Sequence, residues 1–262
     1  MKPEDIVTLM IPVTFLVMLG IEWLFKTGRN WPAIPWWRAK GLAFFIMLMT
    51  LNAILPSLVP PELAQYHLFD GARLGITGGT AVGYLAVSLA NATVHRAYHR
   101  FPLLWRYVHQ LHHSPQRLDI PGAVLFTPLE VINNVAVSFV VMVFVLGLDP
   151  LAAACTAYVA VFYGLFQHFN VHTPHWLGYL IQRPESHGVH HRRGHHSYNY
   201  SDFPIWDMLW GTFRNPPRYL GEVGFEQDES MRIAAMLIGR DVNAAALGPG
   251  SRGSADPGTN PA

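Results

Sequence analysis

The chain has few charged side chains and almost no cysteine. Charged residues make up 13% of its 262 residues and hydrophobic residues make up 51%, whereas an ordinary soluble domain has about 25% charged residues. This composition indicates a membrane protein. The formal net charge is +1, so nothing in the charge balance indicates nucleic acid as a partner.

The single cysteine, Cys155, excludes an intrachain disulfide framework and a cysteine-based zinc site. It lies inside an apolar run, where packing is its expected role. Two familiar metal motifs are also missing. No glutamate is followed three residues later by a histidine, as in soluble di-iron bundles, and the H-E-x-x-H motif of metalloproteases does not occur. A metal site in this chain must therefore use other ligands.

Histidine is abundant and is arranged in four clusters. The stretch HRAYHRFPLLWRYVHQLHH contains the spacings H-x-x-x-H and H-x-x-H-H, and the same two spacings recur in QHFNVH and ESHGVHH. On a helix, residues three and four apart share a face, so the spacing predicts that His95 pairs with His99 and that His109, His112 and His113 form one group. The candidate ligands are His95, His99, His109, His112, His113, His168, His172, His187, His190 and His191.

Clustered imidazoles favour iron, zinc, copper or nickel over calcium or magnesium, which prefer oxygen ligands. Ten ligands are too many for one ion, because tetrahedral zinc takes about four and octahedral ions about six. The number of candidates therefore predicts two metal ions. The alternative is a structural scaffold that holds zinc.

Four histidine clusters in this order, with a hydrophobic hairpin between the second and third, resemble the fatty acid hydroxylase and sterol desaturase superfamily of membrane-bound di-iron enzymes. The segments PLLWRYVHQLHHS and NYSDFPIWDMLWGTF are also similar to signatures of that family, and the resemblance covers about residues 90 to 215. It implies two iron ions, O2 as oxidant and a lipid C–H bond as the target.

Hydroxylation and desaturation of a lipid both fit this resemblance. A membrane protein that transports or stores metal is a third reading. Transport should place ionisable residues within the membrane spans, yet the run from Leu74 to Ala92 contains no Asp, Glu, Lys, Arg or His. Hydroxylation of a fatty acyl, sterol or related lipid is therefore the leading hypothesis, and desaturation is the first alternative.

Apolar runs that are candidates for membrane helices lie at residues 6–25, 41–58, 74–92, 131–148 and 151–166. A helix needs about 20 residues to cross a bilayer, so the last two runs are marginal. A tight Gly147-Leu148-Asp149-Pro150 turn joins them into a hairpin. The sequence predicts an all-α integral membrane bundle of about four or five transmembrane helices.

The side of the membrane follows from the loop that connects the first two runs. This loop lacks acidic residues and contains the basic residues Lys26, Arg29, Arg38 and Lys40. It is therefore expected in the cytoplasm. Because the hairpin returns the chain to the side that it left, all four histidine clusters are expected in one cytoplasmic, histidine-rich helical cap.

Along the chain we expect four regions. They are N-terminal transmembrane helices at 1–92, a histidine-rich catalytic region at 93–225 that contains the hairpin at 131–166, a C-terminal helix at 226–247 and a disordered tail at 248–262. No cytochrome b5 domain is recognisable at either end. Electrons are therefore expected from a separate donor of ferredoxin or cytochrome b5 type with its reductase, docking on the basic residues Arg183, Arg192 and Arg193.

Several residues beside the clusters have expected roles. Asn199 and Asp207 lie in NYSDFPIWD, and either one is expected to orient ligand histidines through hydrogen bonds; a helix cap or an ion pair is the alternative for Asp207. Glu130, with Asn133 and Asn134, is expected to mark the water interface rather than to contact a ligand. The histidines expected not to bind metal are His67, His175, His195 and His196.

Overall fold

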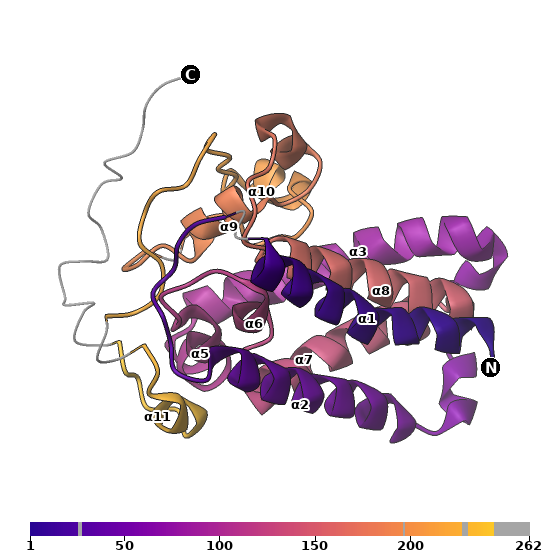
Figure 1. Ribbon diagram of the computed structural model, residues 1–262. Helices are drawn as coiled ribbons and strands as arrows, with labels where there is room; N and C mark the ends of the chain where they lie inside the picture. Colours follow the sequence, from indigo (N-terminus) through magenta and orange to yellow (C-terminus); the bar gives the residue numbers. More distant parts are fainter. Residues whose placement is uncertain (26–27, 196, 227–229, 244–262) are drawn as a thin grey trace.

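Long apolar helices form a bundle, and short helices cover one of its ends (Figure 1). The computed structural model describes residues 1–25, 28–195, 197–226 and 230–243. Within these residues the regular elements are helical, apart from one isolated β-bridge between Arg192 and Val223. The all-α prediction is confirmed.

The bundle helices are α1 (Pro3–Leu24), α2 (Trp37–Ser57), α3 (Gly75–Arg100), α7 (Pro128–Phe139) with its π-helical continuation η4 (Val140–Val145), and α8 (Pro150–Phe166). Both α1 and α3 pack along α8, and α2 packs along α7. By length and composition, α1, α2 and the continuous run α7–η4 can each cross a membrane. Three of the five expected spans are therefore helices that are long and apolar enough to cross a membrane. The other two are α8, which is apolar but shorter, and α3.

Small residues on α3 allow it to approach α8 closely, as in membrane bundles. A Cβ atom added at Gly83 would lie 2.5 Å from Thr156 Oγ1, and one added at Gly79 would lie 3.0 Å from Ala152 Cβ. The many glycines, and the histidines and arginines at its end, also keep α3 less apolar than its neighbours. Its role in the bundle therefore depends on close packing.

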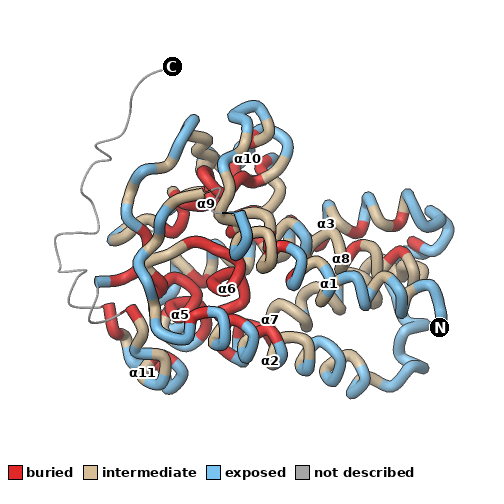
Figure 2. The backbone as a smooth tube through the Cα atoms, viewed as in Figure 1, coloured by how far each residue is buried: buried red, intermediate tan, exposed pale blue. Residues whose placement is uncertain are grey.

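The outer faces of α1 and α2 are apolar and exposed, with Val13 at 59% and Ile46 at 58% exposure. Figure 2 shows that buried residues gather in the cap, whereas the helices of the bundle are largely intermediate or exposed. Exposed apolar faces on long helices are expected where lipid surrounds the protein. Three apolar helices of this length indicate a membrane protein.

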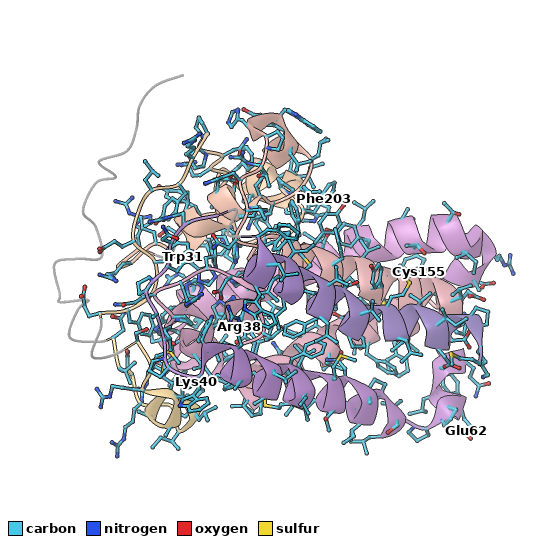
Figure 3. The ribbon with its side chains drawn as sticks, in the orientation of Figure 1. Trp31, Arg38, Lys40, Glu62, Cys155 and Phe203 are labelled. Atoms are coloured by element: carbon cyan, nitrogen blue, oxygen red, sulfur yellow. The ribbon has the colours of Figure 1, made fainter. Side chains whose placement is uncertain are left out.

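The two ends of the bundle differ. At one end, Lys40 lies near the start of α2, and at the other end Glu62 lies in the 3-10 helix η1 (Pro61–Gln65) (Figure 3). The 3-10 helix η2 (Gly71–Leu74) lies in the same connection, and a Cβ atom at Gly147 would meet the His67 ring at 2.6 Å. His67 therefore sits against the hairpin turn, which adopts the tight geometry expected from its glycine (φ +57°).

The cap contains α4 (Pro102–Leu104), the π-helical turn η3 (Trp105–His109), α5 (Gln110–His113), α6 (Ile120–Ala123), η5 (His175–Tyr179), α9 (Pro184–His190), α10 (Ile205–Trp210) and α11 (Ile233–Leu237). Figure 1 shows these elements at the end where α1, α3 and α8 finish and α2 and α7 begin. Every histidine cluster therefore lies at the same end of the bundle.

The C-terminal segment packs on the cap. Gln110 Nε2 donates to Arg240 O at 2.7 Å, and Ser230 Oγ donates to Ser114 O at 2.8 Å. A helix is expected over 226–247, but in the described residues α11 spans only Ile233–Leu237. Gly239, which has a left-handed conformation (φ +72°), follows the end of this helix. The tail expected at 248–262 lies outside the described residues.

Candidate metal centre

Nine histidines gather in two groups within the cap. The first group is His95, His99, His109, His113 and His190, and the second group is His112, His168, His187 and His191. Within each group the candidate ligand nitrogens lie within 4.8 Å of one another, and all the rings are buried except those of His95 and His99, which are intermediate. The four sequence clusters thus contribute to two candidate metal positions.

Each adjacent histidine pair is divided between the groups. His112 and His113 point to different groups, and so do His190 and His191. Neighbouring residues on a helix project about 100° apart, so two adjacent imidazoles cannot share one position. The expectation that His112 groups with His109 and His113 is therefore wrong. The π-helical turn η3 places His109 at its end, and such turns are frequent at functional sites.

The ε-nitrogens of the rings face one another. His95 Nε2 lies 2.9 Å from His109 Nε2. In the second group, His168 Nε2 lies 3.2 Å from the Nε2 atoms of both His112 and His187. Each group therefore concentrates nitrogen atoms on a small volume.

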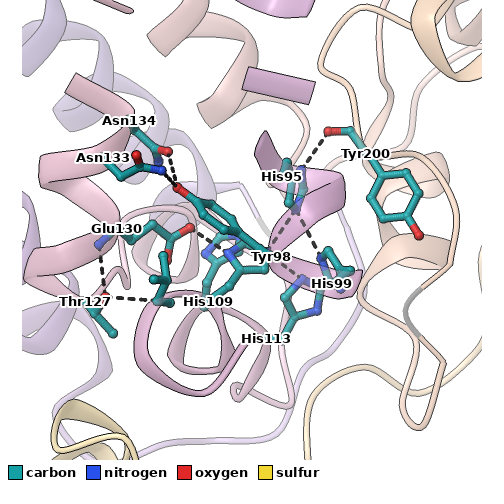
Figure 4. Close-up of polar contacts among 12 residues, drawn as sticks. His95, Tyr98, His99, His109, His113, Thr127, Glu130, Asn133, Asn134 and Tyr200 are labelled. Atoms are coloured by element: carbon teal, nitrogen blue, oxygen red, sulfur yellow. Dashed lines mark hydrogen bonds and ion pairs between the residues drawn. The ribbon is translucent and has the colours of Figure 1, made fainter. Parts of the chain in front are cut away.

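The δ-nitrogens of four rings point outward to oxygen acceptors. The Nδ1–H groups donate from His95 to Tyr200 O (2.6 Å), from His190 to Tyr198 O (2.7 Å), from His168 to Gly164 O (2.9 Å) and from His109 to Glu130 Oε1 (2.6 Å). Figure 4 shows the contacts of His95 and His109. A proton on Nδ1 leaves a lone pair on Nε2, which is the arrangement of metal-ligating histidines.

The positions of these Nε2 lone pairs show whether the two groups suit a metal ion. His95 and His109 both donate through Nδ1, so their Nε2 lone pairs would repel each other across 2.9 Å. Protonation is disfavoured, because burial lowers the pKa of His95 and of His168 to about 4. A cation between the nitrogens removes the repulsion, and neutral imidazoles are ligands for transition metals. The donor set fits two such ions.

Burial also lowers the pKa of four further histidine rings. Desolvation, followed by the proximity of other histidines, holds the pKa of His112, His113, His187 and His191 well below its ordinary value. Burial penalises the charged form of an imidazole. These rings are therefore neutral at physiological pH and are ready to bind metal without losing a proton.

Asn199 and Asp207 hold backbone whose carbonyls accept from ligand histidines. Asn199 has a left-handed conformation (φ +53°), and its Nδ2 atom donates to Ser186 O at 2.7 Å and to Arg214 O at 2.8 Å. Asp207 accepts from Tyr200 N at 2.9 Å and from Ser201 N at 2.8 Å. The two side chains thus fix the loop that carries Tyr198 O and Tyr200 O.

The same loop reaches the second group. Asn199 O accepts a hydrogen bond from Gln182 Nε2 at 2.8 Å, and that nitrogen lies 3.2 Å from His187 Nδ1. Gln182 was not among the candidates from sequence. An isolated glutamine has no spacing signal, and only the folded loop brings it to a ligand ring.

His172 lies outside both groups. Its side chain is 55% exposed, and its Nδ1 atom is 3.9 Å from Glu185 Oε1. Helix α8 ends at Phe166, and the chain from 169 to 174 is not helical, so the H-x-x-x-H spacing does not place His168 and His172 on one face. His67, His175 and His195 also lie outside the groups, and His196 is outside the described residues.

Two expectations about charged residues are wrong. Glu130 is 1% exposed and accepts from His109, so it does not mark the water interface. Arg183 is 0% exposed, and its guanidinium donates to Thr173 O and Asn215 Oδ1, both at 3.0 Å. A buried arginine cannot contribute to a docking surface. Arg193 is partly exposed but pairs with Glu222 at 2.8 Å.

Residues 80–212 match the fatty acid hydroxylase family, and this segment contains all nine grouped histidines. The chain belongs to the fatty acid hydroxylase family. It is 33% identical over 163 residues to an ornithine lipid hydroxylase of Rhizobium tropici, which covers 60% of this chain and 48% of that protein.

A second relative in the comparison is a very-long-chain aldehyde decarbonylase of Oryza sativa subsp. indica. The identity is 28% over 182 residues, which covers 65% of this chain and 64% of the relative. The chain thus aligns with less than two thirds of either relative's length. No solved structure matches the chain. The family membership confirms the resemblance seen in the histidine clusters.

Proposed function

We propose that this protein is a membrane-bound di-iron oxygenase that hydroxylates a C–H bond of a lipid with O2. The observation that carries the proposal is the pair of histidine groups, whose ε-nitrogens converge beside an apolar bundle. The family and the similarity to a lipid hydroxylase support it. When bound, two iron ions supply O2 activation and the oxidant for an unactivated C–H bond.

The residues of the cap have distinct tasks in this proposal. The five rings of the first group hold one ion, and the four rings of the second group hold the other. The carbonyls of Tyr198 and Tyr200 orient His190 and His95 by accepting their Nδ1–H groups. Such contacts fix the ring orientation and make the imidazole a better ligand.

Aromatic rings pack against both groups and limit the access of water. The Trp105 ring lies 5.3 Å from the rings of His99 and His113, and Phe126 stacks on His112 at 4.7 Å. Trp105 is 8% exposed. A dry site protects a reactive oxidant from side reactions with solvent.

The electron balance calls for a partner. Hydroxylation uses one O2, two electrons and two protons, inserts one oxygen atom into the C–H bond and releases the other as water. We therefore propose a separate ferredoxin or cytochrome b5 type donor with its reductase. Desaturation needs the same electrons but removes two hydrogen atoms from the lipid and forms two waters, so the donor does not distinguish the two reactions.

Mass spectrometry of lipids tests the proposed reaction. Cells that make the protein, grown under ¹⁸O2, are expected to contain a lipid with one added ¹⁸O atom that is absent from cells making His168→Ala. Purified, iron-loaded protein should form the same product only when the donor and its reductase are present. Turnover without the donor would contradict the electron proposal.

Other products would identify the alternatives. A lipid that lacks two hydrogen atoms would establish a desaturase. The similarity to an aldehyde decarbonylase favours one further assay, in which a long-chain aldehyde is supplied. A product that has lost the carbonyl group, without any ¹⁸O-labelled lipid, would replace hydroxylation by decarbonylation.

We also propose that the cap faces the cytoplasm, because the chain from 25 to 40 contains Arg29, Arg38 and Lys40 but no acidic residue. Cysteine labelling tests this in a Cys155→Ala background. With a membrane-impermeant maleimide on intact cells, Glu62→Cys should be labelled and Lys40→Cys should not, because the two positions lie at opposite ends of the bundle (Figure 3). The reverse pattern would invert the topology.

A further inference from the structure

Glu130 lies at the start of α7, where the sequence Thr127-Pro128-Leu129-Glu130 has the pattern of a capping box. In that motif the glutamate side chain returns to the backbone N–H of the first residue. Here only half of the motif forms: Thr127 Oγ1 accepts from Glu130 N at 3.1 Å. The carboxylate instead accepts from His109 Nδ1 at 2.6 Å (Figure 4).

Thr127 also fixes the position of this carboxylate relative to the imidazole. Its hydroxyl donates to Val108 O at 2.9 Å, one residue before His109. One threonine side chain therefore joins the N-terminus of α7 to η3. The Glu130–His109 contact is thus supported from both of its elements.

Helix stability does not account for Glu130. Its side chain is 2% exposed, and that of His109 is 3% exposed. Within the part of the chain that the structure describes, Glu130 Oε2 is buried without a hydrogen-bond partner. A buried polar atom without a partner destabilises a fold, and such an atom in a native structure calls for a functional explanation. The contact with a grouped histidine supplies one.

The groups that face the δ-nitrogens of the ligand rings differ between the two groups of histidines. In the second group, His168 Nδ1 meets a neutral carbonyl and His187 Nδ1 lies beside the amide of Gln182, whereas His109 in the first group meets a carboxylate. A carboxylate behind a ligating histidine raises its basicity toward the metal.

We infer that Glu130 is a positioning residue that fixes the proton of His109 on Nδ1, so that the first group holds its ion more tightly than the second. The inference rests on the proposed function only in that two transition-metal ions bind. It concerns the relative affinity of the two positions for a metal ion. Neither family membership nor the number of histidines in each group determines this ratio.

Cobalt(II) binding tests this without substrate, donor or O2. The absorption of bound Co²⁺ depends on its ligands, so His168→Ala provides a reference spectrum for the first position and His95→Ala provides one for the second. With one equivalent of Co²⁺, the wild-type protein should give the first-position spectrum. In Glu130→Gln, which keeps the size of the side chain, the first position should weaken about 10- to 100-fold and the spectrum should shift toward the second.

A matched control is Glu22→Gln. Glu22 is partly buried and accepts from Ile120 N at 3.2 Å and from Asn170 N at 2.7 Å, so its carboxylate serves the fold. This variant should melt at a lower temperature but should fill the first position as the wild type does. If Glu22→Gln shifts the spectrum equally, the effect is one of general stability and the inference is overturned.

An unchanged Co²⁺ spectrum in Glu130→Gln would also overturn the inference. Glu130→Ala adds a larger perturbation, and Glu130→Asp tests whether a carboxylate restores the first-position preference. The cobalt result and the lipid assay can fail separately. If Glu130→Gln shifts the Co²⁺ spectrum but the wild-type protein forms no hydroxylated lipid, the role of Glu130 stands and the hydroxylase proposal is rejected. If the wild type forms the lipid product but Glu130→Gln does not shift the spectrum, the hydroxylase proposal stands and the role of Glu130 is rejected.

Discussion

Alanine at any of the nine grouped histidines is expected to lower bound iron below two ions per chain and to reduce turnover below detection. Each substitution removes one ligand nitrogen from a group of four or five. For the four rings whose Nδ1–H donates, it also leaves an acceptor without its donor, as in His95→Ala, where Tyr200 O loses the 2.6 Å hydrogen bond. Losing only an outer contact typically costs about 10- to 100-fold in metal affinity or activity, so losing a ligand should cost more.

Elemental analysis of iron and product formation across the single variants measure this effect. The controls are the histidines outside the groups, His67, His172, His175 and His195. Their alanine variants should retain two ions and measurable turnover. His172→Ala is the most informative of them, because the sequence predicts a ligand there and the side chain is 55% exposed. Loss of iron in this variant would restore the ten-ligand set, and a normal His168→Ala enzyme would contradict the second group.

The sequence predicts the helical bundle and most of the candidate ligands for simple reasons. Apolar runs of sufficient length become helices in a membrane protein, and residues at H-x-x-x-H on one continuous helix share a face. His95 and His99 both lie on α3 and join the same group. The prediction fails for His172 because α8 ends before it. Helix boundaries are less certain from sequence than helix content.

Tertiary contacts account for what the sequence does not predict. His112 and His113 are divided between two groups because His168, after α8, and His187, on α9, meet His112 only in the folded chain. Glu130 has the spacing of a capping residue, so local rules assign it to the helix terminus rather than to His109. Arg183 looks like a surface charge in sequence but lies buried among backbone carbonyls.

The loop between α9 and α10 is expected to control the first group through Asn199 and Asp207. Asn199→Ala removes three hydrogen bonds, those that Nδ2 donates to Ser186 O and Arg214 O and the one that Oδ1 accepts from Arg214 N, and it places a residue without a polar side chain at φ +53°. Net hydrogen bonds contribute about 1 kcal/mol each, and the left-handed conformation costs about 1 kcal/mol or more without glycine or asparagine. A loss of about 4 kcal/mol in unfolding free energy is therefore expected.

Asn199→Gly separates the two causes. Glycine adopts the left-handed conformation freely but cannot replace the hydrogen bonds, so this variant should recover about 1 kcal/mol relative to Asn199→Ala. Both variants should still lose cobalt or iron from the first group, because the carbonyls of Tyr198 and Tyr200 are no longer held. Full metal binding in Asn199→Gly would show that backbone conformation alone positions these carbonyls.

Asp207→Asn should weaken the first group by about 10- to 100-fold in metal affinity. The carboxylate accepts from both Tyr200 N and Ser201 N, whereas an amide offers only one oxygen and directs its NH2 group at the other donor. Tyr200 is thereby loosened, and its carbonyl is the acceptor for His95 Nδ1. Thr212→Ala is the matched control, because it removes the 2.7 Å hydrogen bond from Thr212 Oγ1 and leaves both backbone contacts in place. Equal loss of metal in the two variants would show that the charge network around Asp207, rather than its hold on Tyr200, governs the first group.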